Sequence, residues 1–387
     1  MWALPALVLT VLLTLLLVES DKLREFEALG QDIQMRLSPP PSRSDVALVV
    51  INDTDFKEIF DSTRPLNPAK LHDLIDAIAK GKPRVIGVDL NTSDPKFKDF
   101  QVESWWPPLV WGRMVMEFEP SVIENPVPER PVALDVLGGG RPELNNAQHS
   151  GLPSVIDIDN VTRAYQRVVE TSSGEVLPTI PWAVVKKFDN GIAAAREEST
   201  APLMISYAGD PRGSHRTELS AAEVLDYAAD PGWANNGYIK DDIVLIGADY
   251  PREDRHETPL GEMLGVRIMA TVIETELSGG GIKRPGRLAL LPLWILQALA
   301  LILVFQFFPL RKEPLRNVSL TIILVPVTVL LCSLIASRSL AYWSYFVPIA
   351  VGVVISQLLD QLNDFRKEKL SQAVSNVIGN EETASGR

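Results

Sequence analysis

The hydrophobic residues of this chain follow two patterns, one continuous and one periodic. Residues 2–18, 288–310, 318–336 and 340–359 are continuously apolar. A helix that crosses the hydrocarbon core of a bilayer needs about 20 apolar residues. The last three stretches contain no Lys, Arg, Asp or Glu, so they predict membrane-spanning helices. The first stretch follows no basic residue and ends at no small-x-small cleavage site, so we expect a retained anchor rather than a signal peptide.

A helical pattern continues past the first apolar stretch. Between residues 19 and 37, apolar residues recur at steps of three and four until the prolines at 39–41. This spacing predicts a stalk helix. Its apolar stripe packs either on the domain that follows or against a partner helix.

Residues 42–286 alternate between short β-branched runs and segments with helical spacing. Strands are predicted at residues 46–51, 85–90, 109–118, 164–170, 203–207 and 243–247. Helices are predicted at residues 68–80, 181–188, 220–229 and 264–277. The segment 119–151 is rich in Pro and Gly and is expected to be a loop. Strands separated by helices indicate an α/β domain with a mainly parallel sheet flanked by helices.

The two patterns together predict five parts. These are an anchor (1–18), a stalk and linker (19–41), an extracytoplasmic α/β domain (42–286), three spans (287–360) and a short cytoplasmic tail (361–387). Four spans place both termini on one side of the membrane, and we expect that side to be the inside. Basic residues near the spans are balanced between the two sides, so the positive-inside rule adds nothing.

Three glycines at residues 279–281 separate the last predicted helix of the domain from the second apolar stretch. Consecutive glycines swivel freely unless they are packed. We therefore expect the glycines to act as a hinge and the stalk to carry any signal between domain and membrane.

Charge and cysteine content exclude some classes of function. The chain has a net charge of −12, which argues against nucleic acid as a partner. Cys332 is the single cysteine and lies in the third apolar stretch, so the domain has no internal disulfide. The sequence contains no Gly-x-Ser-x-Gly, phosphate loop, GxGxxG or HExxH pattern. We expect no catalytic residues, no metal and no cofactor.

Ionisable residues that follow predicted strands form the candidate ligand-binding site: Asp53, Asp89, Asp249, Asp254, Arg255 and His256. The carboxyl ends of parallel strands share one edge of a sheet, so these side chains are able to converge on a cation or a basic ligand. Alternatively, each carboxylate caps a helix or pairs with an arginine such as Arg255. His256 is either a proton-linked switch or a surface histidine among charges.

Two further groups of residues suggest sites by their composition. Asp157, Asp159 and Asn160 suggest a calcium loop, but the glycine and the distal glutamate of such a loop are absent, which favours a turn. The tryptophans at 105, 106 and 111 line an apolar pocket, pack a core or lie on the membrane surface.

Several local motifs, taken in order, resemble the CHASE domain of type two. They are Val49-Val50-Ile51-Asn52-Asp53, Val85-Ile86-Gly87-Val88-Asp89, Asp157-Ile158-Asp159-Asn160-Val161, Ile243–Ala248 with Asp254-Arg255-His256, and Gly265-Val266-Arg267-Ile268. The resemblance covers roughly residues 25–359. The chain departs from the family's pattern at Asn160, where Gly is usual, and at Met269, where His is common. We also expect no cytoplasmic output domain, because the polar stretch after residue 360 is short.

The resemblance implies an extracytoplasmic sensory module of the kind found with bacterial cyclases and histidine kinases. We expect a sensor or signal-input subunit in the bacterial inner membrane that relays through its transmembrane helices to a separate signalling partner. A small molecule or a protein outside the cell is the expected ligand, and homo-oligomers fit this interpretation. The alternatives are a structural subunit of an envelope complex and, third, an envelope hydrolase that uses the acidic strand ends.

Overall fold

The computed structural model describes residues 32, 44–116, 132–139, 148–151, 155–158, 161–207, 216–250, 254–283 and 369. The chain divides into two units, Asp32–Lys283 and the remainder, Met1–Gln31 with Arg284–Arg387. The four predicted membrane spans lie outside the described residues, as do the tail apart from Lys369 and the stalk apart from Asp32. Among the helices that the structure does describe, none has the length and apolar character that a membrane crossing requires.

A six-stranded sheet organises the first unit. Its strand order is β12-β1-β13-β2-β3-β6, and every neighbouring pair is parallel. The strands are β12 (Glu218–Ser220), β1 (Val46–Ile51), β13 (Ile243–Ala248), β2 (Val85–Val88), β3 (Leu109–Gly112) and β6 (Gln148–Gly151). The central strands are apolar along their whole length because helices cover both faces of the sheet. The predicted parallel sheet is therefore confirmed.

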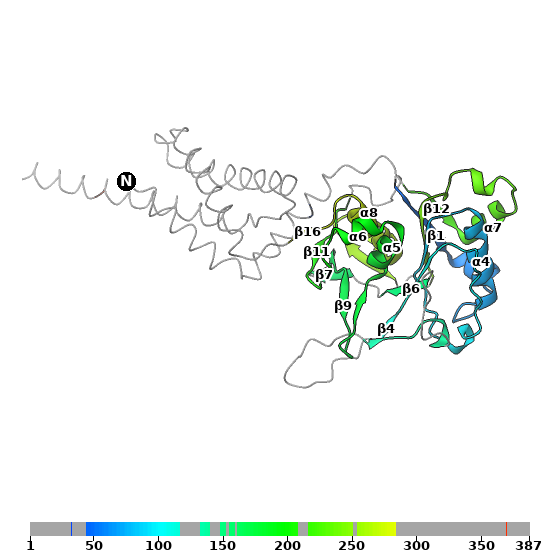
Figure 1. Ribbon diagram of the computed structural model, residues 1–387, viewed down its shortest axis with the longest axis horizontal. Coiled ribbons are helices and arrows are strands. Elements are labelled where there is room, and N and C mark those ends of the chain that lie inside the picture. The colour runs from blue at the N-terminus through cyan, green and yellow to red at the C-terminus, as the bar shows by residue number, and fades with distance from the viewer. Residues whose placement is uncertain are drawn as a thin grey trace, which may run out of the picture. The chain divides into compact units, whose positions relative to one another are not determined.

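Four helices make up the layers on either side of the sheet (Figure 1). On one face lie α4 (Pro68–Lys80) and α7 (Ala221–Ala228); on the other lie α5 (Ile180–Phe188) and α8 (Gly265–Leu277). Two short helices, α3 (Asp53–Glu58) and α6 (Asn190–Ala194), complete the set.

Local sequence explains where two of these helices begin. The Asn67 side chain accepts a hydrogen bond from the Ala69 amide at 3.1 Å, and Pro68 occupies the first turn of α4. A reciprocal capping box between Ser220 and Glu223 starts α7.

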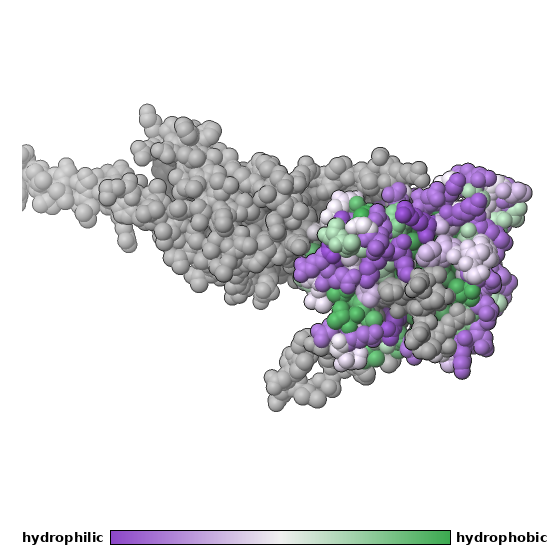
Figure 2. All heavy atoms as spheres, in the orientation of Figure 1, coloured by the Kyte–Doolittle hydropathy of each residue, from purple (hydrophilic) through white to green (hydrophobic). Residues whose placement is uncertain are grey.

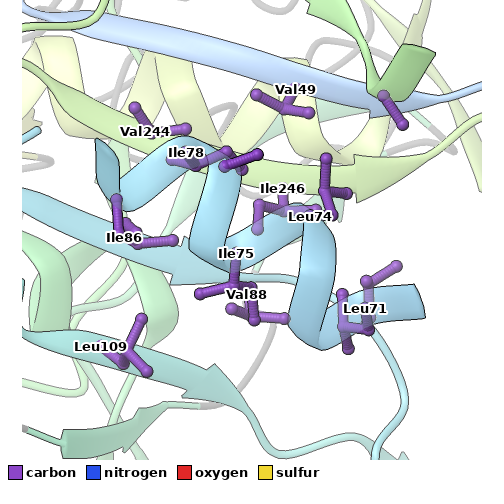
Figure 3. Packing of buried hydrophobic residues seen from close by; sticks show 14 of the residues in the cluster. Val49, Leu71, Leu74, Ile75, Ile78, Ile86, Val88, Leu109, Val244 and Ile246 are labelled. Atoms are coloured by element: carbon purple, nitrogen blue, oxygen red, sulfur yellow. The ribbon is translucent and has the colours of Figure 1, made fainter. Parts of the chain in front are cut away.

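The core between α4 and the sheet shows how strand alternation assigns side chains to layers. Val49, Ile86, Val88, Val244 and Ile246 lie on the same face of the sheet and meet the apolar side of α4 (Figure 3). Each of these side chains is fully buried. Full burial of one such aliphatic side chain contributes about 1.5–3 kcal/mol. In contrast to this core, the described surface that Figure 2 shows is mostly hydrophilic, with hydrophobic residues in small patches.

A second, antiparallel sheet covers the far side of α8. Its order is β16-β11-β8-β7, from β16 (Ile282–Lys283), β11 (Leu203–Met204), β8 (Val161–Tyr165) and β7 (Val155–Ile158). Val266 and Ile273 of α8 pack toward the parallel sheet, whereas Ile268 and Val272 pack with residues of the second sheet. Because α8 lies between two layers, it is buried nearly all round.

Three hairpins and three short 3₁₀ helices complete the unit. The hairpins pair β9 (Val168–Glu170) with β10 (Val176–Pro178), β14 (Arg255–Thr258) with β15 (Gly261–Leu264), and β4 (Val115–Met116) with β5 (Val132–Ala133). The 3₁₀ helices are η1 (Pro95–Phe97), η2 (Leu137–Gly139) and η3 (Trp233–Asn235).

Three sequence expectations need correction. The strand predicted at 109–118 breaks after Gly112, because β3 joins the parallel sheet and β4 pairs with β5 instead. The loop predicted at 119–151 ends in β6, which pairs with β3 at the edge of the parallel sheet. The strand predicted at 164–170 is divided between the end of β8 and β9, which lie in different sheets.

Two smaller expectations concern the Asp157–Asn160 turn and the tryptophans. Ile158 pairs with Val161 where β7 meets β8, and Asp159 and Asn160 of the predicted turn lie outside the described residues. Trp106 and Trp111 are buried in the core beside α4, and Trp105 is exposed.

Candidate functional site

Two of the predicted carboxylates lie at neighbouring strand ends. The Asp89 amide donates to the Ile246 carbonyl at 2.8 Å, and the Asp249 amide donates to the Ile51 carbonyl at 2.9 Å. The ends of β1, β13 and β2 therefore lie side by side at the carboxyl edge of the sheet. Val88 faces α4, so strand alternation places the Asp89 side chain on the opposite face, where α5 and α8 pack.

Residues of the β14–β15 hairpin reach the same edge. The Arg255 guanidinium donates to both oxygens of Asp249, at 2.8 and 2.9 Å, and lies 3.6 Å from Glu262. The hydrogen bond to Asp249 raises the pKa of Arg255. The alternative in which a strand-end carboxylate pairs with Arg255 is therefore realised for Asp249. This pair ties the hairpin to the end of β13.

Asp254 lies against the first residue of α8. Its carbonyl accepts the Gly265 amide at 3.1 Å, and a Cβ atom on residue 265 would collide with the Asp254 carboxylate. His256 Nε2 lies 3.2 Å from Asp254 Oδ1. A carboxylate near a helix N-terminus is favourable because the helix dipole is positive there. Only glycine at position 265 leaves room for this arrangement.

Asp89 is the most perturbed carboxyl of the group. Burial, together with the smaller effect of the neighbouring Asp254 charge, raises its pKa to about 7, and His256 opposes this rise. Within the described residues, no hydrogen bond reaches the Asp89 carboxylate. The structure thus brings together Asp89, Asp249, Asp254, Arg255 and His256. No group of three acidic, His or Cys side chains in the described part of the chain is arranged to hold a metal ion.

Asp53 does not join them. It is exposed in the first turn of α3, which starts directly after Asn52 and turns Asp53 toward solvent. Its neighbour Asp55 is buried instead, and its carboxylate accepts the amides of Ala221 and Ala222 at 3.1 and 3.2 Å. Asp55 therefore caps α7 from another element. The capping-box spacing of Asn52 and Asp55 was a sequence signal for α3 but not for this second contact.

A second charged cluster, absent from the sequence prediction, lies at the other end of α8. The Glu276 side chain has no exposure and accepts two hydrogen bonds from Arg167, at 2.9 and 3.2 Å. Arg196 and the Tyr165 hydroxyl also donate to it. Burial and the Glu276 charge raise the pKa of Tyr165. Nearby, Glu274 accepts hydrogen bonds from Arg216 and from the Ser44 hydroxyl.

The glycines after α8 are held in place, so the expected free hinge is wrong. The Gly280 amide donates to Thr275 at 2.8 Å, and the Gly281 amide donates to the Tyr165 hydroxyl at 3.1 Å. A Cβ atom on Gly281 would meet Leu203, the Met204 carbonyl and Tyr165 within 2.8 Å. Gly279 and Gly280 have φ of 128° and 98°. Glycine is needed here because the tight turn requires positive φ, and not because the segment must swivel.

The comparisons with known proteins place the chain in a family. The family model of the CHASE2 domain matches residues 7–308. The chain belongs to the CHASE2 domain family. CHASE2 is a sensory domain of extracytoplasmic type, which is consistent with a sensor role. A comparison with curated proteins found no significant match, and neither did a comparison with solved structures.

Proposed function

We propose that this chain is a membrane-anchored, extracytoplasmic signal-input subunit of the bacterial inner membrane. In this proposal the CHASE2 domain senses a condition or ligand outside the membrane and relays it through transmembrane helices to a separate signalling protein. The observation that carries the proposal is the family match over residues 7–308. The four apolar stretches of the sequence support the anchoring, and no catalytic step is assigned.

The position of α8 supports a relay. One end of α8 begins at the cluster of Asp89, Asp254 and His256, at the carboxyl edge of the sheet where ligands of α/β domains usually bind. The other end carries Glu274 and Glu276. A buried helix with one end at a site and the other at the chain's exits is suited to transmit a shift between them.

Both chain segments that lead out of the domain are attached near the second end of α8. Before the domain, Ser44 donates to Glu274, and helical Asp32 forms a two-bond ion pair with Arg163 at 2.7 and 3.0 Å. This ion pair favours the interpretation in which the stalk packs on the domain. After the domain, Gly281 bonds to Tyr165, which itself bonds to Glu276.

The test is to purify the full chain from its native host in mild detergent, identify what copurifies and assay that protein's activity. We expect a kinase, cyclase or protease whose activity changes when the chain is removed. Glu276→Gln should weaken this effect, and Glu175→Gln, an exposed glutamate, should leave it intact. Copurification of envelope structural proteins alone would replace the sensor by the interaction-subunit alternative.

A further inference from the structure

Asp89 occupies a position that its hydrogen bonds do not explain. It is partly buried at the end of a central strand, on the face covered by α5 and α8. Within the described residues its carboxylate accepts no hydrogen bond, whereas Asp249 on the next strand is held by both bonds from Arg255. A buried carboxylate without donors is costly when ionised, and a proton removes that cost.

The groups around Asp89 favour proton exchange rather than a fixed charge. Asp254 and His256 are the charged groups that interact with it from the hairpin, and Asp254 is itself 3.2 Å from His256. The first turn of α8 contributes Arg267, which is paired with Glu218 at 2.6 Å. The first turn of α5 contributes only Ile180, Pro181 and Trp182. Asp89 itself is in no ion pair with a described residue, and a second carboxyl nearby disfavours its ionisation.

We propose that Asp89 binds and releases a proton as the pH outside the membrane changes, and that the β14–β15 hairpin shifts against the first turn of α8 when it does. The inference rests on the proposed function in one respect: that function places the domain outside the membrane, where this pH would be sensed. It names the proton as the signal and Asp89, rather than His256, as its receptor.

The connection to α8 follows from the contacts of Asp254. When Asp89 is protonated, its neutral carboxyl does not repel the Asp254 charge. When the proton leaves to solvent, two carboxylates face each other and repel. Asp254 is bound to the start of α8 through the Gly265 amide and packs on the Gly265 Cα, so its displacement moves the hairpin or the first helical turn.

The experiment measures hydrogen–deuterium exchange of the full chain in mild detergent between pH 5 and pH 9. Each rate is divided by the intrinsic rate at that pH. In the wild type, the segment 254–266 should change its protection with a midpoint near pH 7. Asp89→Asn should abolish the transition and hold the segment at its low-pH level. Asp53→Asn, at the same edge but exposed, is the matched control and should behave as the wild type.

Two further variants separate the contributing groups. Asp254→Asn removes a charge that raises the pKa of Asp89, so its midpoint should move to lower pH. His256→Gln should keep a transition, with a midpoint at higher pH. The proposal is overturned if the wild type shows no transition, if Asp89→Asn retains it, or if His256→Gln abolishes it. Because no partner protein takes part, these results are independent of whether a signalling partner is found.

Discussion

Replacement of Glu276 by Gln tests the charged cluster at the end of α8. The glutamate has no exposure, and its partner Arg167 is also buried, with a side-chain exposure of 6%. Glutamine keeps the size of the side chain but removes the negative charge. Arg167 and Arg196 would then remain close together without the anion that both contact.

The expected cost follows from the burial of the partners. Removal of one member of a buried ion pair costs about 3–5 kcal/mol because it leaves an uncompensated charge. For a domain of roughly this size, each kcal/mol lowers the melting temperature by about 2–4 °C. We therefore expect Glu276→Gln to lower it by about 10 °C. The matched control, Glu175→Gln, removes an exposed glutamate 4.0 Å from Arg113 and should cost about 0–1 kcal/mol.

The assay is thermal unfolding of the full chain in mild detergent, followed by tryptophan fluorescence. Trp182 lies 4.9 Å beneath the Arg167 guanidinium and reports on the cluster directly. Faster hydrogen exchange at residues 279–283 should accompany the loss, since Tyr165 links Gly281 to Glu276. If Glu276→Gln melts within about 2 °C of Glu175→Gln, the buried arginine network is not what stabilises this end of α8.

Four other outcomes are expected. Ile246→Asp should unfold the domain, as seen by circular dichroism, because a charge in this fully buried strand costs several kcal/mol. Gly265→Ala should lower the melting temperature through its collision with Asp254, and a second substitution, Asp254→Gly, should restore it. The folded pKa of Asp89, about 7 against an ordinary 3.8, means that the folded state binds the proton more tightly. The contribution of Asp89 to stability, measured in urea as the difference between the wild type and Asp89→Asn, should therefore be fully present below about pH 4 and be lost, by up to ~4 kcal/mol, as the pH rises from 4 through 7. A reporter fused after Arg387 should be active in the cytoplasm, and activity only in the periplasm would refute the predicted topology.

The central strands could be predicted because their apolar runs are local signals that are visible in the sequence. β1 and α4 begin and end at the predicted positions, since a β-branched run and an Asn-Pro cap are both local signals. β6 was missed because Gln148–Gly151 has no apolar pattern. It becomes a strand through backbone pairing with β3 at the edge of the sheet, and such pairing is not written in its side chains.

One rule of parallel sheets predicted part of the site. Carboxyl ends of parallel strands share an edge, and this rule correctly brought Asp89 and Asp249 together with the hairpin residues. It failed for Asp53 because the chain enters α3 at once and turns that side chain outward. The cluster around Glu276 could not be predicted from the sequence, because Arg167 and Tyr165 lie 109 and 111 residues away from Glu276 along the chain.

The packing of the three glycines determines how the proposed relay would leave the domain. A free hinge would have isolated α8 from the segment that follows, leaving the stalk as the sole connection. Instead β16 pairs with β11, and Gly281 is fixed by the hydroxyl that also binds Glu276. Asp32 forms its ion pair with Arg163, which precedes Ala164 in β8. Because Arg163 and Gly281 both lie in the layer that packs on α8, the proposed relay would act on both connections when α8 shifts.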